Sequence, residues 1–307
     1  MVLDGVVDPK RVWYQANLDQ DPAFEHAIRV WFAWVARYDS VYRLGKTEAA
    51  VRKRWYAEQD ALRRRPAGGD IGPAEWTDLF VSAAYYQSTW TDEAALFASW
   101  VHDRDVDVLR YTYQTSDDYG DDNGFAVYNA VQCTDAKAPT KWRTWRTDAK
   151  RVAARSPFLT YSNLWFNAPC HSWPVRAGTP SKVDGRRAPK ILLVNQTGDA
   201  ATPYAGAKVV RRLFPRSVLL AEPGGTTHAG SLGGNRCTDD VVARYLKTGA
   251  TVRRHRGTGA DVTCAPLPKP TPSRVQVTEL GRSARTPAPA SDPFSLQAVL
   301  QAAQAPR

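Results

Sequence analysis

The chain has 307 residues, of which 43% are hydrophobic and 11 are tryptophan, so we expect a packed globular core and exclude disorder of the whole chain. Its 41 basic and 31 acidic residues give a formal net charge of +10. Such a charge attracts anionic surfaces, but we interpret it as a basic exterior exposed to solvent, which is the commoner case. No run of about 18 apolar residues occurs in the sequence, so no membrane span is predicted.

The first nine residues, MVLDGVVDP, are typical of a buried strand that runs straight into a loop. Hydrophobic residues then recur at helical spacing from Pro22 to about Arg155. The clearest helical stretches span residues 47–65, 73–84, 91–102 and 140–155, with Thr91 as the expected N-cap of the third. We therefore predict a strand in 1–9 and a mostly helical region over 10–185.

An acidic, glycine-containing segment, SDDYGDDNG, spans Ser116 to Gly124 within this helical region. Its spacing departs from that of an EF-hand, because Tyr119 would stand at the first ligand position if Gly124 were the loop glycine. We interpret the segment as a solvated loop and predict no metal site.

The pattern changes to alternating strands and helices over residues 186–268. A continuous apolar strand at 191–194 precedes a helix at 205–214, and a second strand at 218–220 precedes a helix at 237–249 that Gly249 stops. Strands separated by helices in this way pair in parallel. Residues 269–307 are rich in Pro and Ala, so we predict a disordered tail whose last part, 295–305, forms a short helix.

Four cysteines, Cys133, Cys170, Cys237 and Cys264, are widely spaced and contain no C-x-x-C pair. This pattern favours disulfides over a zinc site or a redox motif. Four cysteines allow three connectivities. One of them joins sequence neighbours, Cys133 with Cys170 and Cys237 with Cys264. An oxidising compartment is favoured, although the N-terminus has no basic region followed by an apolar stretch of the kind found in signal peptides.

Two polar loops follow the two predicted strands of the 186–268 region. In a parallel sheet, reactive side chains collect just past the carboxyl ends of the strands. The first loop carries Asp199 and the second carries His228, so a carboxylate and an imidazole are expected at the same edge. In such a pair an aspartate orients a histidine that acts as a general base. Taken singly, Asp199 fits a turn and His228 fits an ordinary loop histidine.

The segments ILLVNQTGDAATPYAGA and GTTHAGSLGGNRC, with the closing Cys264, resemble the C-terminal catalytic region of the tripeptidyl aminopeptidase-like α/β-hydrolases. AVYNAVQC and NAPCHSWPV resemble lid segments of that family, and MVLDGVVDP resembles the strand that follows its nucleophile helix. The resemblance implies a partial α/β-hydrolase fold with a large helical lid. It also implies a secreted serine peptidase with Asp199 as acid and His228 as base, a peptide or small acyl substrate, and no cofactor.

The sequence contains no G-x-S-x-G nucleophile turn, the motif in which this superfamily places its serine. Ser231, in TTHAGSLGG, comes after both expected partners and only three residues after His228, so it does not fit that position. We therefore expect the nucleophile upstream of Met1, an uncovered sheet edge, and no activity from the chain alone, which would be a fragment or the product of a truncated gene.

Two other interpretations remain open at this stage. One is a non-catalytic module that binds peptides or hydrophobic ligands in the lid. The other is a polyanion-binding face formed by the basic clusters 52–54 and 63–65, but no nucleic-acid motif accompanies these charges, so no nucleic-acid partner is predicted.

Overall fold

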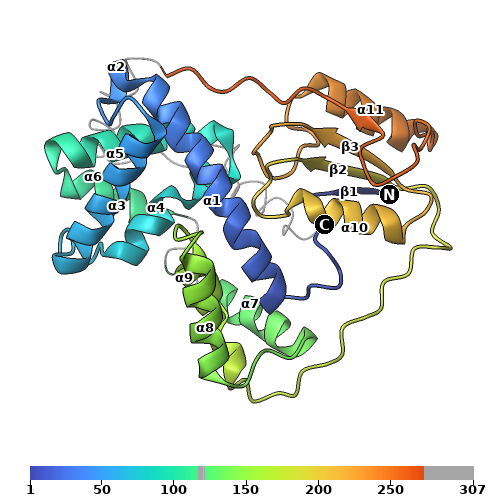
Figure 1. The fold of residues 1–307 in the computed structure, drawn as a ribbon, viewed down its shortest axis with the longest axis horizontal. Helices are drawn as coiled ribbons and strands as arrows, with labels where there is room; N and C mark the ends of the chain where they lie inside the picture. The colour runs from blue at the N-terminus through green and yellow to red at the C-terminus, as the bar shows by residue number, and fades with distance from the viewer. Residues whose placement is uncertain (117–119, 121, 273–307) are drawn as a thin grey trace, which may run out of the picture.

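The computed structural model describes residues 1–116, 120 and 122–272. It contains a sheet and a group of helices, most of which lie in sequence between the first strand and the second (Figure 1). The predicted tail helix at 295–305 and part of the acidic loop at 116–124 lie outside the described residues.

The sheet has four strands in the spatial order β1-β2-β3-β4: β1 (Val2–Asp4), β2 (Leu192–Gln196), β3 (Val218–Glu222) and β4 (Val262–Thr263). All three pairings are parallel; that of β2 with β3 was predicted, whereas β4 was not. Val2 lies opposite Leu192, so the N-terminal strand joins the sheet across a long stretch of intervening chain. Within the described residues β1 pairs only with β2, which leaves it at one edge of the sheet.

Alternate residues of β2 and β3 are buried on opposite faces of the sheet. Leu192, Val194 and Leu220 pack with residues of α11 (Arg236–Thr248), whereas Leu193 and Leu219 pack with residues of α10 (Tyr204–Leu213). The two helices therefore cover the two faces, as Figure 1 shows. Burial on both sides explains why β2 and β3 are continuous apolar runs in the sequence.

The helical region contains the following elements: α1 (Tyr14–Arg37), α2 (Asp39–Tyr42), α3 (Glu48–Arg64), α4 (Pro73–Tyr85), η1 (Gln87–Thr89), α5 (Trp90–Asp103), α6 (Val106–Gln114), α7 (Asp122–Asp135), α8 (Trp142–Ala153), α9 (Thr160–Phe166) and η2 (Ala168–His171). Their core is aromatic, with the rings of Trp31, Trp55, Trp76, Phe80 and Phe97 in mutual contact. This core explains the high tryptophan content of the chain.

Two predicted helix starts were wrong. The first long helix begins at Tyr14 and contains Pro22, whose ring lies on the exposed face, while Phe24 and Ile28 hold the buried face in the core. The loss of one backbone donor at the proline is outweighed by this burial. Thr91 is a buried residue inside α5, not its N-cap, because the short 3-10 turn η1 leads directly into the helix at Trp90.

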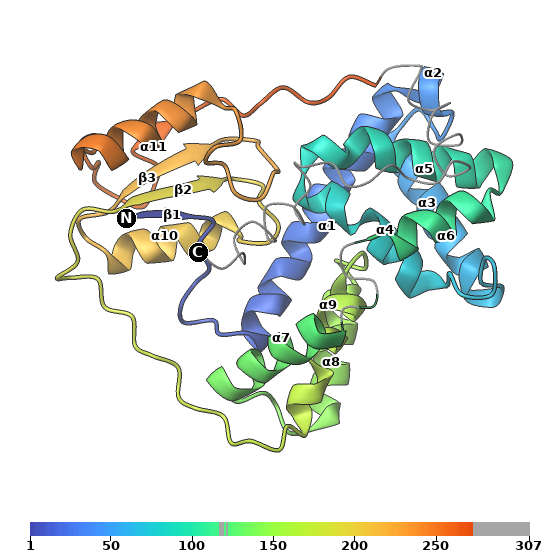
Figure 2. The same ribbon diagram turned by 180° about the vertical axis from the view of Figure 1, so that it is seen from behind.

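The carboxyl ends of the strands point toward the helical region (Figure 2). Two segments run between the sheet and the helical region on this side. Residues 5–13 lead from β1 into α1, and residues 264–272 lead from β4 to the helical region. In the second segment the carbonyl of Pro270 accepts a hydrogen bond from Trp34 Nε1 at 2.9 Å. The loops that follow β2 and β3 therefore open into the space between sheet and helices.

The disulfides are Cys133–Cys170, which ties α7 to η2, and Cys237–Cys264, which ties the start of α11 to the residue after β4. Of the three connectivities that the sequence left open, the structure thus has the one that pairs sequence neighbours. Among the described residues, no helix has the length and apolarity that crossing a bilayer requires.

Candidate active site

Asp199 lies in the loop between β2 and α10 and is almost completely buried. Its carboxylate accepts hydrogen bonds from the Thr202 amide at 2.8 Å and the Thr202 hydroxyl at 2.7 Å. Asn195 Nδ2, from the end of β2, donates a third bond at 3.3 Å. The turn Asp-Ala-Ala-Thr therefore holds the carboxylate in one orientation at the edge of the sheet.

His228 lies in the loop between β3 and α11 and reaches across to Asp199. Its Nδ1 is 3.0 Å from Oδ2 and 3.2 Å from Oδ1 of that carboxylate. Because an ionised carboxylate only accepts hydrogen bonds, Nδ1 carries the proton and Nε2 is left as the basic nitrogen. The hydrogen bond to Asp199 raises the pKa of His228 above its usual value, and this gain outweighs the opposing effect of partial burial. The pair is thus arranged to take up a proton at Nε2 and to stabilise the imidazolium that results.

The loop that carries His228 is anchored on the helical region as well as on the sheet. The His228 amide donates to the carbonyl of Tyr85, the last residue of α4, at 2.7 Å. One residue earlier, the Thr227 amide donates to Gln196 Oε1 at 2.7 Å. The tyrosine ring also lies edge-on to the imidazole, with ring centroids 5.9 Å apart. The helical region therefore helps to set the position of the histidine.

Three residues of this site were not predicted from the sequence. Thr202 and Asn195 hold Asp199, and Gly5, which has a φ of +67°, lies against the imidazole. A side chain at Gly5 would place its Cβ 3.1 Å from His228 Cε1. The spacing from Asp199 to Thr202 was a usable signal for a hydrogen-bonded turn, whereas the approach of Gly5 depends on pairing across the whole chain.

Ser231 is not hydrogen-bonded to His228. Its hydroxyl donates to the carboxylate of Asp4, the last residue of β1. Ala229, directly after the histidine, has a φ of +59°. The structure thus brings together Asp199 and His228 but assigns Ser231 to the support of the loop.

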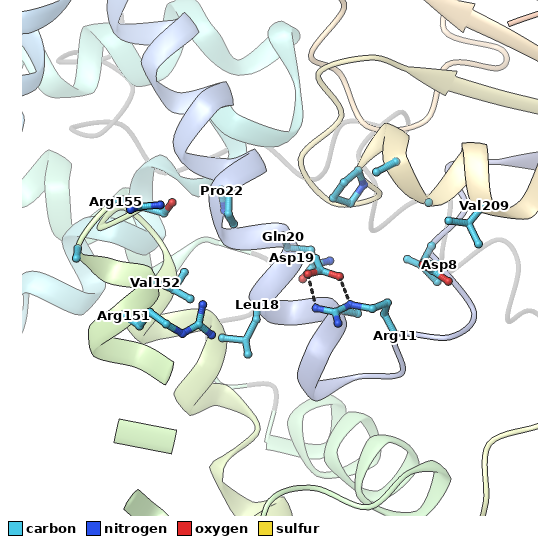
Figure 3. A pocket seen from close by; sticks show the side chains of 17 residues that line it. Asp8, Arg11, Leu18, Asp19, Gln20, Pro22, Arg151, Val152, Arg155 and Val209 are labelled. Atoms are coloured by element: carbon cyan, nitrogen blue, oxygen red, sulfur yellow. Dashed lines mark hydrogen bonds and ion pairs between the residues drawn. The ribbon is translucent and has the colours of Figure 1, made fainter. Parts of the chain in front are cut away.

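Two cavities adjoin this edge of the sheet. One, of about 390 Å³, is lined by His228, Tyr86 and Leu267 among others. The second, of about 950 Å³, lies between the start of α1, the end of α8 and α10, and reaches Pro203, which follows the Asp199 turn. Figure 3 shows Arg151 and Arg155 on one side of it, the Arg11–Asp19 ion pair in the middle, and Asp8 and Val209 on the other side.

Residues 1–116, 120 and 122–272 contain no cluster of three or more His, Cys, Asp or Glu side chains arranged to hold a metal ion. The acidic segment 116–124 lies partly outside these residues.

Comparison with known proteins places this geometry in a family. Residues 156–264 match the α/β-hydrolase family described as TAP-like protein. The chain is 44% identical over 279 residues to a tripeptidyl aminopeptidase of Streptomyces coelicolor, a match that covers 89% of this chain and 50% of that protein. It is 30% identical over 262 residues to carboxylesterase B of Mycobacterium tuberculosis, covering 81% and 50% of the two chains.

A third relative is serine protease Hip1 of Mycobacterium tuberculosis, which is 28% identical over 270 residues, covering 82% of this chain and 51% of that protein. The chain therefore spans about half the length of the curated relatives it matches. These relatives are hydrolases by name, and their match agrees with the parallel sheet and helical region described above. The chain belongs to the TAP-like α/β-hydrolases.

Proposed function

We propose that Asp199 and His228 are the acid and the base of a serine-type hydrolase that cleaves peptides through an acyl-enzyme. The observation that carries this proposal is the contact between His228 Nδ1 and the buried Asp199 carboxylate at the carboxyl edge of a parallel sheet. The tripeptidyl aminopeptidase and serine protease names of the relatives support peptides as substrates. The 390 Å³ cavity beside His228 offers room for part of a peptide.

We further propose that the serine nucleophile comes from outside this sequence, which has no G-x-S-x-G motif. The hydrogen bond from the Ser231 hydroxyl to Asp4 supports a structural role for that serine. An Asp–His pair without a nucleophile acts on water only as a general base, which contributes roughly 10²–10⁴-fold. The chain by itself should therefore hydrolyse peptides very poorly.

The disulfides support an oxidising environment, so we propose that the protein works outside the cytoplasm. The tripeptidyl aminopeptidase relative suggests that short N-terminal peptides are the units removed.

A chimera tests the catalytic proposal directly. In the Streptomyces coelicolor tripeptidyl aminopeptidase, the region matched by this chain is replaced by this chain, and hydrolysis of a tripeptidyl p-nitroanilide is measured. The chimera should be active, and His228→Ala or Asp199→Asn should abolish nearly all of the activity. Asp240→Asn, an exposed carboxylate on α11, is the matched control and should change little. Full activity of the His228→Ala chimera would refute the proposed base.

Ser231 receives a separate test in the same chimera. Ser231→Ala should retain most of the activity, and a fluorophosphonate probe should label a serine in the aminopeptidase portion rather than Ser231. Labelling of Ser231 in the isolated chain would overturn the proposal that the nucleophile lies elsewhere.

A further inference from the structure

Asp4 occupies a position that nothing in the reaction outlined above uses. It is the last residue of β1, and the next amide, that of Gly5, donates to the carbonyl of Val194 in β2 at 3.0 Å. Its backbone is therefore fixed by the sheet, while its side chain extends past the carboxyl edge. This places a second carboxylate beside the loop that carries His228.

The Asp4 carboxylate accepts hydrogen bonds from three donors in that loop. The Gly230 amide lies 3.0 Å from both oxygens, and the Ser231 amide lies 2.7 Å from Oδ2. The Ser231 hydroxyl donates to the same Oδ2. Bonds from neutral donors to an ionised carboxylate are stronger than those between neutral groups, so this set is a strong local anchor.

The anchored turn also has a backbone that requires support. Ala229, between the histidine and the first bonded amide, has a φ of +59°, a region that residues other than glycine seldom adopt. Such conformations persist where surrounding contacts determine them. The Tyr85 carbonyl binds the loop at the His228 amide, and Asp4 binds it two and three residues later, so the strained residue lies between two anchors.

We propose that Asp4 is a positioning residue for His228: its carboxylate, at the end of β1, fixes the turn that follows the histidine and so holds the imidazole against Asp199. Its negative charge also favours the imidazolium over the neutral ring. The proposal rests on the proposed role of His228 as a base, but its geometry stands independently of any hydrolysis.

The other titratable groups near His228 bear on how Asp4 is tested. Asp199 contacts the imidazole from the loop after β2, and Tyr85 lies edge-on to it from α4. Tyr86 and Glu222 line the same cavity as the histidine. Since Asp199 makes the largest contribution to the protonation of His228, the effect of Asp4 on that protonation should be the smaller of the two. Exchange of the bonded amides is therefore the primary measurement.

The experiment measures backbone amide hydrogen exchange and the titration of the His228 ring by NMR in the full chain. In Asp4→Asn, exchange protection of the Gly230 and Ser231 amides should fall by roughly 10- to 100-fold, the loss expected when a charged acceptor is removed. The titration midpoint of His228 should move to lower pH. Protection of the β2 and β3 amides should stay unchanged, which a general loss of structure would not allow.

Two control variants separate the parts of the anchor. Ser231→Ala removes the hydroxyl donor but leaves the carboxylate and both amides, so the backbone amide at position 231 should keep its exchange protection. Asp240→Asn removes an exposed carboxylate elsewhere and should change neither readout. Unchanged protection of the Gly230 and Ser231 amides in Asp4→Asn would overturn the proposal.

A measurement on the unchanged chain covers the case in which Asp4→Asn does not fold. In the unchanged chain the Gly230 and Ser231 amides should both be protected from exchange, and rapid exchange of both would also overturn the proposal. In the chimera, Asp4→Asn should shift the acid limb of the kcat/KM profile to lower pH. If the His228→Ala chimera is active and Asp4→Asn loses amide protection, the proposed base is refuted and the role of Asp4 stands. If the His228→Ala chimera is inactive and Asp4→Asn keeps amide protection, only the role of Asp4 is refuted.

Discussion

Glu93 allows a quantitative test of how burial in the helical core changes the pKa of an acid and the stability of the chain. This residue lies in the first turn of α5, is buried and accepts a hydrogen bond from the Ser82 hydroxyl. Desolvation raises the pKa of Glu93 to about 8, an effect that outweighs the hydrogen bonds to it. Because the carboxyl is neutral in the folded chain and ionised in the unfolded chain, stability is lost as the pH rises from 4.5 toward 8.

The size of this loss follows from the shift. Each pKa unit corresponds to about 1.36 kcal/mol, so between pH 4.5 and pH 7 the ionisation costs about 3 kcal/mol. Glu93→Gln keeps an acceptor for Ser82 and removes the ionisable proton. We therefore expect the variant to be more stable than the original chain by about 3 kcal/mol at pH 7 and nearly equal to it at pH 4.

The assay is urea unfolding followed by tryptophan fluorescence at pH 4, 7 and 8, with the disulfides intact. The matched control is Asp92→Asn, which neutralises the neighbouring exposed carboxylate of the same helix turn and should change stability by no more than about 1 kcal/mol. A Glu93→Gln chain with equal stability at pH 7, or with a gain that is the same at every pH, would refute the reasoning.

Substitutions at three other positions should also change the stability of the chain. Gly5→Ala should lower the melting temperature and displace the imidazole ring in NMR spectra, because the added methyl would lie 2.7 Å from Thr202 Oγ1 and 3.1 Å from His228 Cε1. Arg211→Met should cost about 3–5 kcal/mol in urea unfolding, because it removes the only cation paired with the buried Asp261 carboxylate among the described residues and leaves two backbone amide donors. Asp199→Asn should destabilise the chain more at pH 5 than at pH 9: the raised pKa of His228 makes the ion pair contribute fully below the unfolded value of 6.5, and this contribution disappears as the pH rises through the folded value. Urea curves for both chains at the two pH values check this, and equal differences would contradict it.

The sheet and the placement of Asp199 and His228 were accessible from the sequence because each depends on a local pattern. Continuous apolar runs predicted β2 and β3, and the rule that loops meet at the carboxyl edge of parallel strands predicted that the two side chains lie close together. Their catalytic roles remain a prediction. The sequence predicted disulfides but left three connectivities open, and the structure has the one that joins sequence neighbours.

The contacts that sequence patterns did not reveal join residues far apart in the chain. The bonds from the Gly230 and Ser231 amides to Asp4 span more than two hundred residues, and the bond from the His228 amide to Tyr85 spans more than one hundred. No periodicity records such pairings. The wrong helix starts have a different cause, since Pro22 and Thr91 are local signals that tertiary packing overrode.

The pairing of Val2 with Leu192 also determines the order in which the protein is completed during synthesis. A ribosome adds about 5–20 residues per second, so β1 emerges roughly 10–40 s before the strand with which it pairs. During that interval the whole helical region is made, while the edge of β1 that pairs with β2 has no partner. A nascent chain stalled before residue 192 should therefore leave this edge of β1 open to chaperones and proteases, and one stalled well beyond residue 222 should protect it.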